Sequence, residues 1–179
     1  MLGEIVLKNF INYDRKSAVN YALEWVLGRN PKYKDYEDWG GDCTNFISQC
    51  VHAGKIPFDH EGGDILKQWY WYSDMARTPS WTAAEPFYKY IIGNNSQNTS
   101  NYGIYAKEVA YEDLEIGDIV QLIYENNLAY HNMIITDKIV QDGLFVDYLI
   151  CQHTYDLYNY PLSLKAGMKR YIKILGYYA

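Results

Sequence analysis

The hydrophobic pattern changes from a helical to a strand period near residue 113, and this change limits the fold more than any other feature. Between Asp14 and Gly54 apolar residues recur with the spacing of amphipathic helices. From Asp113 onward the apolar segments are short, near-alternating and separated by turn residues, which is typical of strands. Helices followed by a meander of strands predict an α+β fold with an antiparallel sheet.

Three helices are predicted before residue 95. The first follows Asp14, a residue that can cap a helix, and ends at Gly28 before "RNP". The second begins at or just before Cys43 and ends at Gly54. A shorter helix is predicted for "TAAEPFYKYII", which starts at Thr82. The first two helices flank the polar loop "NPKYKDYEDWGGD", so the cysteine stands at a loop-to-helix junction.

Four strands are predicted in the C-terminal third. They lie in "EIGDIVQLIY", "HNMIITDKIV", "LFVDYLICQH" and "KRYIKILGYY", and "QDG" predicts a hairpin between the second and the third. Residues 58–112 are less regular and rich in aromatic residues, and "WYWY" at 69–72 fits either a strand or a helix. "GNNSQNTSNYG" at 93–103 is predicted to be a polar loop. We expect a single domain over 1–179, with 58–112 as an irregular insertion within it.

Composition narrows the function classes. The 179 residues can enclose a substantial core, and a net charge of −6 argues against nucleic acid or an anionic membrane surface as the main partner. No apolar run approaches the roughly 20 residues of a membrane-spanning helix. The first residues do not resemble a signal peptide, which fits a cytoplasmic protein or a domain cut from a longer secreted chain.

The three cysteines are too few and too irregularly spaced for a disulfide framework, so we expect free thiols. Cys43, Cys50, His52 and His60 form a C-x6-C-x-H-x7-H array, which fits no tight zinc spacing, and we predict no metal site. Cys50 lies on the apolar stripe of its helix and Cys151 lies in an apolar strand. Both are predicted to be core residues, since a free cysteine packs like a small hydrophobe.

Cys43 differs because it follows a glycine pair and lies off the apolar stripe. A helix N-terminus carries unpaired N–H groups and a positive dipole, which favour a thiolate and could also stabilise an oxyanion. Cys43 is therefore a candidate nucleophile, and a nucleophile needs a base within hydrogen-bond reach.

His131 is the candidate base, since it opens a strand and can face a cleft. His153 ends the following strand, and the start of one strand meets the end of its antiparallel neighbour. His153 is accordingly expected next to His131, where it could orient the base by a hydrogen bond. Gln152 and Asp156 are alternatives for that orienting role.

Several segments together resemble a known family. These are "YEDWGGDCTNFISQCVHAG", "DLEIGDIVQLI" with "YHNMIITD", and "QHTYD". The chain is similar to the putative amidase domain family of bacteria, and more distantly to the NlpC-type and CHAP groups of papain-like cysteine peptidases and amidases. The resemblance spans nearly the whole chain. It implies a papain-like α+β fold in which the nucleophile opens a helix packed on an antiparallel sheet that supplies the histidine and a polar third residue.

The resemblance implies that Cys43 is the nucleophile, His131 the base and His153 the orienting residue. Thr44 and Asn45 stand where NlpC-type domains usually have Ser–Gly, and the loop before Cys43 lacks a glutamine to serve as a papain-type oxyanion donor. We expect the backbone N–H of Cys43 to act instead, together with a side chain such as that of Tyr36 or Asn45. Asp42 is expected to cap or fix the loop.

The leading hypothesis is hydrolysis of an amide bond through a thioester. The resemblance implies peptidoglycan or another short peptide as substrate. The aromatic residues at 69–72, Trp81 and Tyr88 could line the groove or pack a small subdomain over the sheet. An acyltransferase would use the same residues, and an inactive binding module would keep the fold with an unreactive Cys43. None of the three requires a cofactor.

Overall fold

The computed structural model describes residues 9–93 and 103–178 and shows an α+β fold. The predicted loop at 93–103 falls largely outside these residues. The helices are α1 (Arg15–Trp25), α2 (Cys43–Ala53), α3 (Pro79–Thr82) and α4 (Ala84–Gly93), with short 3-10 turns at Glu37–Trp39, Ile65–Lys67, Tyr111–Asp113 and Leu162–Leu164. The strands are β1 (Phe10–Asn12), β2 (Trp71–Ser73), β3 (Ala76–Arg77), β4 (Gly103–Glu108), β5 (Ile119–Ile123), β6 (Ala129–Gln141), β7 (Leu144–Gln152), β8 (Leu157–Pro161) and β9 (Met168–Tyr178).

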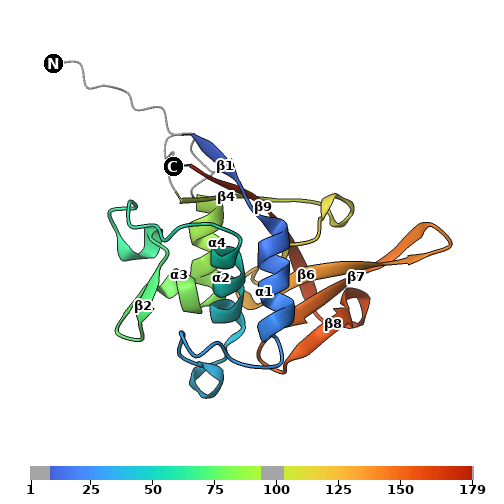
Figure 1. Ribbon diagram of the computed structural model, residues 1–179, viewed down its shortest axis with the longest axis horizontal. Coiled ribbons are helices and arrows are strands. Elements are labelled where there is room, and N and C mark those ends of the chain that lie inside the picture. Colours follow the sequence, from blue (N-terminus) through green and yellow to red (C-terminus); the bar gives the residue numbers. More distant parts are fainter. Residues whose placement is uncertain (1–8, 94–102, 179) are drawn as a thin grey trace.

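The main sheet has seven strands, and every pairing in it is antiparallel. Its order is β1-β9-β5-β6-β7-β8, and β4 also pairs with β9. Helices α1, α2 and α4 stand side by side on one face of this sheet, and each of them contacts β6 (Figure 1). The predicted α+β class with an antiparallel sheet is therefore confirmed.

The two long helices begin where the sequence predicts. The side chain of Asp14 accepts hydrogen bonds from the Ser17 N–H at 3.0 Å and the Ser17 hydroxyl at 2.9 Å, which caps α1. Helix α2 is buried from Cys43 to Val51, because α1, the α3–α4 segment and the sheet surround it. Its apolar residues join a core that includes Phe46, Ile134 and Ile172.

Part of the aromatic segment 58–112 belongs to the body of the protein. Trp69 and Trp81 are fully buried in the helix-side core, and Trp71 begins the short strand β2. The end of the segment contains β4, which pairs with β9 in the main sheet. Both buried tryptophans therefore pack in the core and do not line a groove.

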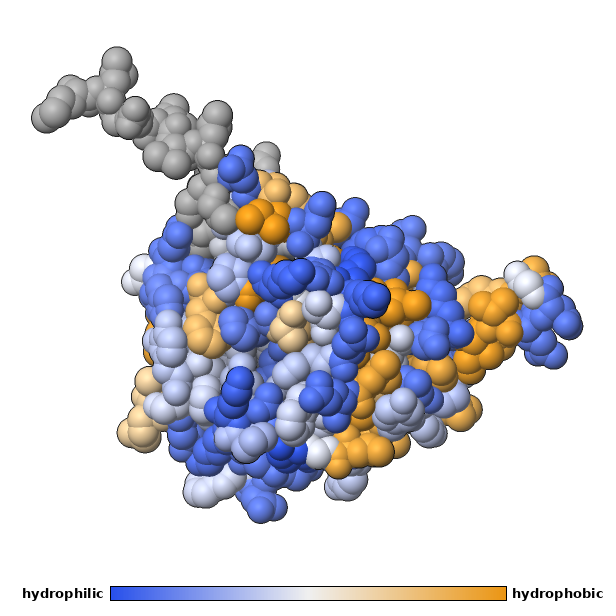
Figure 2. Space-filling model, viewed as in Figure 1, coloured by the Kyte–Doolittle hydropathy of each residue, from blue (hydrophilic) through white to orange (hydrophobic). Residues whose placement is uncertain are grey.

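The hairpin of β6 and β7 extends beyond the rest of the molecule (Figure 1). It turns at Asp142 and Gly143, whose φ angles are +52° and +77°, as the "QDG" signal predicts. Exposed apolar side chains cover it (Figure 2), namely Val140, Leu144, Phe145 and Val146. None of the described helices is long and apolar enough to cross a membrane.

Candidate active site

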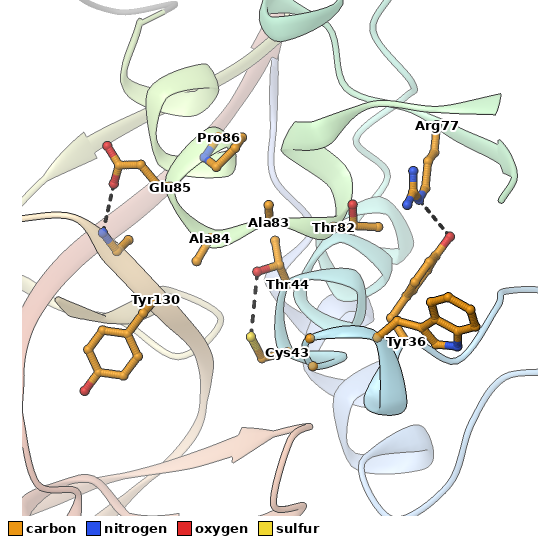
Figure 3. Close-up of a pocket in the computed structure, with 14 residues that line it drawn as sticks. Tyr36, Cys43, Thr44, Arg77, Thr82, Ala83, Ala84, Glu85, Pro86 and Tyr130 are labelled. Carbon is orange, nitrogen blue, oxygen red and sulfur yellow. Dashed lines mark hydrogen bonds between the residues drawn. The ribbon is translucent and has the colours of Figure 1, made fainter. Parts of the chain in front are cut away.

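A pocket of about 440 Å³ opens beside the first turn of α2. Its walls come from the loop before α2, the end of β3, the α3–α4 junction and the start of β6. The lining residues are Tyr36, Trp39, Gly40, Gly41, Cys43, Thr44, Arg77, Thr82, Ala83, Ala84, Glu85, Pro86, Ala129 and Tyr130. In Figure 3, Cys43 lies between a wall that carries Arg77 and Tyr36 and a wall that carries Glu85 and Tyr130. Cys50 and Cys151 are fully buried and do not line this pocket.

The glycine pair before Cys43 is required by backbone geometry. Gly40 and Gly41 have φ angles of +106° and +105°, which residues with a Cβ rarely adopt. A Cβ on Gly41 would also lie 2.9 Å from the hydroxyl oxygen of Thr154. That same hydroxyl accepts the backbone N–H of Asp42 at 2.8 Å. The two glycines thus let the loop turn sharply enough to make Cys43 the first residue of α2.

Asp42 is buried and holds this loop together. Its Oδ1 accepts hydrogen bonds from the Tyr36 N–H at 3.0 Å and from Asn45 Nδ2 at 2.8 Å. Its Oδ2 lies 2.5 Å from His153 Nδ1 and 3.7 Å from Arg29 Nε. The side chain does not cap α2, and Asp42 does not line the pocket. Its contacts therefore give it a loop-fixing role rather than a direct one toward substrate.

The structure does not place His153 where it could orient His131. Besides the contact to Asp42, its Nε2 lies 3.0 Å from the Trp25 carbonyl oxygen, so both ring nitrogens are occupied. The ring stacks on Phe46 with centroids 3.9 Å apart. His153 comes just after β7 ends, and its side chain enters the helix-side core. The expected contact with His131 is therefore not made.

Gln152 is better placed for the orienting role. Its Nε2 donates hydrogen bonds to the carbonyl oxygens of Thr154 and Tyr155, at 2.9 Å and 3.1 Å, which fixes the orientation of the amide. Its Oε1 and the Nε2 of His131 are both buried, and neither makes a well-formed hydrogen bond. The Gln152 side chain nevertheless lies close enough to His131 to raise its pKa through hydrogen bonding. We therefore place Gln152 beside the imidazole in an imperfectly aligned contact.

His131 is neutral at neutral pH because it is almost buried. It lies at the start of β6, opposite Leu122 of β5, and is 8% exposed. Burial lowers its pKa to about 4, and the charge of Lys165 contributes in the same direction. The hydrogen-bonding effect of Gln152 opposes this shift but does not cancel it. A neutral imidazole is the form that can accept a proton from a thiol.

The buried imidazole predicts a pH-dependent contribution to stability. Its pKa is about 4 in the folded chain and near 6.5 when unfolded. The unfolded chain therefore binds more protons between these values, and stability falls as the pH falls from 6.5 to 4. Relative to His131→Gln, the wild-type free energy of unfolding should decrease by up to roughly 3 kcal/mol over this range. Urea titrations at several pH values measure this difference, and parallel curves for the two proteins would contradict it.

The Cys43 thiol lies against the strand that carries His131. Its Sγ is close enough to the backbone N–H of Asn132 for that group to lower the thiol pKa by hydrogen bonding, and Thr44 acts in the same direction. Burial is the larger effect and raises the pKa of the thiol, because the side chain is only 7% exposed. The low thiol pKa expected at a helix N-terminus is thus offset by burial. A thiolate here needs a proton acceptor nearby, and His131 is the residue before Asn132.

Three polar residues of the site were not among the candidates from the sequence. The Thr44 hydroxyl oxygen lies 3.7 Å from Cys43 Sγ and accepts a hydrogen bond from Asn132 Nδ2 at 2.8 Å (Figure 3 shows the Thr44–Cys43 contact). Asn132 Oδ1 in turn accepts from Gln121 Nε2 at 2.9 Å. Since the Thr44 oxygen is an acceptor toward Asn132, its hydrogen is left for Cys43 or the pocket. The position of Thr44, one residue after Cys43, is the sequence signal that could have identified it.

Two predicted oxyanion donors and one predicted orienting residue are engaged elsewhere. Asn45 Nδ2 donates to Asp42 and to the Lys34 carbonyl oxygen, and its Oδ1 accepts from Trp81. The Tyr36 hydroxyl lines the pocket but donates to Asp74 at 3.1 Å. Asp156 forms two hydrogen bonds with Arg29, at 2.9 Å and 3.1 Å, on the surface. In this geometry neither Asn45 nor Tyr36 has a hydrogen free for an oxyanion, and Asp156 does not contact His131.

No cluster of three or more metal-ligating side chains occurs within 9–93 and 103–178. The arrangement that does occur is a thiol at the N-terminus of a helix, opening into a pocket, with the helix packed against strand β6, whose third residue is a buried histidine. Thiol and imidazole are the groups of nucleophilic catalysis. The protein therefore has an α+β fold with a site suited to hydrolase chemistry.

The chain belongs to the family described as "putative amidase domain", whose model matches residues 12–175. It is 30% identical over 173 residues to uncharacterized protein YjcM of Bacillus subtilis (strain 168), covering 89% of this chain and 36% of that protein. It is also 34% identical over 128 residues to uncharacterized protein YhbB of the same strain, covering 70% of this chain and 38% of that protein. The chain thus spans less than two fifths of the length of these relatives. No solved structure matches it.

Proposed function

We propose that this domain is a cysteine-dependent amidase or peptidase that cleaves an amide bond through a thioester. One observation carries the proposal. Cys43 lines the pocket on a helix that packs against β6, and its neighbour Thr44 accepts a hydrogen bond at 2.8 Å from Asn132, the residue after His131. A helix that presents a cysteine to a histidine-bearing antiparallel sheet supports a papain-like arrangement related to the NlpC-type and CHAP groups. Peptidoglycan peptides or other short peptides are the proposed substrates.

The mechanism begins from a neutral thiol and a neutral imidazole. His131 takes the proton of Cys43 as Sγ attacks the carbonyl carbon, which forms the C–S bond and a tetrahedral oxyanion. The imidazolium then gives this proton to the leaving amine as the C–N bond breaks, and a thioester remains. Water attacks the thioester with His131 again as the base. The C–S bond then breaks, the acyl group is released as a carboxylic acid, and the imidazolium returns its proton to Sγ.

Two donors near Cys43 can stabilise the oxyanion. The Cys43 N–H has no partner within α2, because it belongs to the first residue of the helix. The Thr44 hydroxyl lines the pocket, and its oxygen is held by Asn132. Donors fixed in this way need little reorganisation when charge develops. In this scheme Gln152 is a positioning residue that holds the imidazole from its other side.

Trapping of the acyl-enzyme tests the proposal. The protein is mixed with a set of short peptides that includes peptidoglycan stem peptides, quenched in acid and measured by intact-mass spectrometry. We expect a thioester adduct on Cys43 that is absent from Cys43→Ala. A covalent cysteine mechanism would be contradicted if the peptide were cleaved without an adduct and Cys43→Ala cleaved it equally well. Added glycinamide distinguishes hydrolysis from acyl transfer. An acyltransferase would pass the acyl group from the thioester to glycinamide, giving an amide product in preference to the free acid.

A further inference from the structure

Arg77 is the one arginine among the described residues that line the pocket, and only part of its guanidinium is engaged in hydrogen bonds. It ends β3 and lines the wall that Figure 3 shows on the opposite side of Cys43 from Glu85. Its Nε donates a hydrogen bond to the Tyr36 hydroxyl at 2.9 Å, and the guanidinium lies 5.0 Å from the centre of the Tyr36 ring. Within 9–93 and 103–178 neither terminal nitrogen, Nη1 nor Nη2, has a hydrogen-bond partner, and 32% of the side chain is exposed.

The charge of Arg77 is not balanced locally. The nearest carboxylate is that of Asp74, 3.7 Å from Arg77 Nε. Asp74 is held more closely by Lys34, at 2.6 Å, so this cluster contains two positive charges and one negative charge. The acid on the opposite wall is Glu85, which accepts the Ala129 N–H at 2.8 Å and pairs with Lys89 at 3.5 Å. Among the described residues, Arg77 thus shares its nearest carboxylate with Lys34, and this wall of the pocket carries an excess of positive charge.

An arginine held by its Nε and by an aromatic face presents its terminal nitrogens as a fork. Two parallel N–H groups match the two oxygens of a carboxylate, and this pairing is stronger and more directional than a contact with a neutral group. Trp39, which is 75% exposed, lines the same pocket and offers an apolar surface there. The pocket therefore combines the candidate nucleophile, an exposed aromatic surface and an arginine whose two terminal nitrogens are free for a bidentate contact.

We propose that Arg77 binds a carboxylate of the substrate, so that the site selects amides carrying a negative charge near the bond to be cleaved. This inference rests on the proposed function of Cys43. The carboxylate is either the C-terminus of a short peptide or the side chain of an acidic residue, because both present the same pair of oxygens.

Matched alkylating reagents test this selectivity without a known substrate. N-iodoacetyl-glycine carries a main-chain carboxylate, and its amide lacks one. N-iodoacetyl-aspartic α-amide and N-iodoacetyl-asparagine α-amide do the same for a side-chain carboxylate. Rates at Cys43 are measured by peptide mass spectrometry at low salt and divided by the rates with glutathione. At least one acid should react about tenfold faster than its amide, and salt should reduce this preference. The pair showing the preference identifies the source of the carboxylate.

Variants assign the preference to Arg77. Arg77→Gln should bring the acid-to-amide ratio close to one, and Arg77→Lys should retain part of it because the charge remains. Lys16→Gln, which removes an exposed positive charge on α1 outside this pocket, should leave the ratio unchanged. Fast alkylation of Cys43 with no acid preference, or a preference that survives in Arg77→Gln, would overturn this inference and leave the proposed function intact. If Cys43 reacts no faster than Cys50 with any reagent, both proposals fail.

Discussion

Replacing Cys43 with alanine is expected to lower kcat/KM for amide hydrolysis by about 10⁴-fold or more. The change removes the atom that forms the covalent bond, and nucleophile deletions in comparable hydrolases have effects of this size. The substrate is the peptide identified by acyl-enzyme trapping, and the released amine is quantified by chromatography. Because Cys43 packs at the pocket surface rather than in the deep core, the variant should keep its fold.

Cys50→Ala is the matched control for this prediction. Cys50 lies on the same helix but is fully buried and outside the pocket. We expect it to lose some stability through its small cavity and to retain most of its activity at temperatures below unfolding. Equal activity losses in the two variants would indicate that the helix matters for structure alone and would contradict a nucleophilic role for Cys43.

Replacing Asp42 with alanine is expected to reduce the free energy of unfolding by about 3–5 kcal/mol. The carboxylate is fully buried and is bonded to the Tyr36 N–H, to Asn45 and to His153. Removing the carboxylate leaves these buried groups without a hydrogen-bond partner, and each unsatisfied buried group costs about 1–3 kcal/mol. Urea unfolding followed by circular dichroism measures the change.

Asp156→Ala gives the comparison for Asp42. Both carboxylates approach Arg29, but the Asp156 side chain is 29% exposed and forms its pair at the surface. Surface pairs of this kind contribute at most about 1 kcal/mol. Similar losses for the two variants would show that the buried Asp42–His153 contact does not stabilise the loop before Cys43.

The local elements of the fold could be predicted because their signals are local. Asp14 caps α1 through Ser17, three residues after the cap, and the turn at Asp142–Gly143 requires residues that tolerate positive φ. The start of α2 at Cys43 follows from the glycine pair and from the apolar spacing after it. In each case the deciding interaction lies within a few residues of the pattern.

Contacts between distant segments could not be predicted in the same way. The start of β6 and the end of β7 do lie together, as antiparallel pairing predicts, since Ile134 pairs with Cys151. Antiparallel pairing alone does not determine the direction in which each side chain points. Thr154 and Tyr155 have positive φ, so the chain turns directly after β7, and Gln152 rather than His153 lies beside His131.

The pocket walls also depend on long-range packing. Arg77 comes from a two-residue strand in the aromatic segment, and it reaches the site only because that segment packs against α2 through Trp69 and Trp81. The pKa of Cys43 likewise depends on how deeply its side chain is buried, which the helix N-terminus alone does not determine. Burial here outweighs the local dipole, so a thiolate at this position would need a proton acceptor, which is the role we propose for His131.

The rate of iodoacetamide alkylation as a function of pH, resolved to each cysteine by mass spectrometry, tests a His131-activated Cys43 most directly. Burial raises the pKa of the Cys43 thiol, but His131 is proposed to take its proton during the attack, so Cys43 should react well below pH ~8.5, the value near which an isolated thiol titrates. Cys50 and Cys151 should stay inert because they are fully buried. His131→Gln should abolish the reaction at the lower pH. Reaction of Cys43 as an ordinary thiol, with the same profile in His131→Gln, would contradict the catalytic pair and favour a binding module with the same fold.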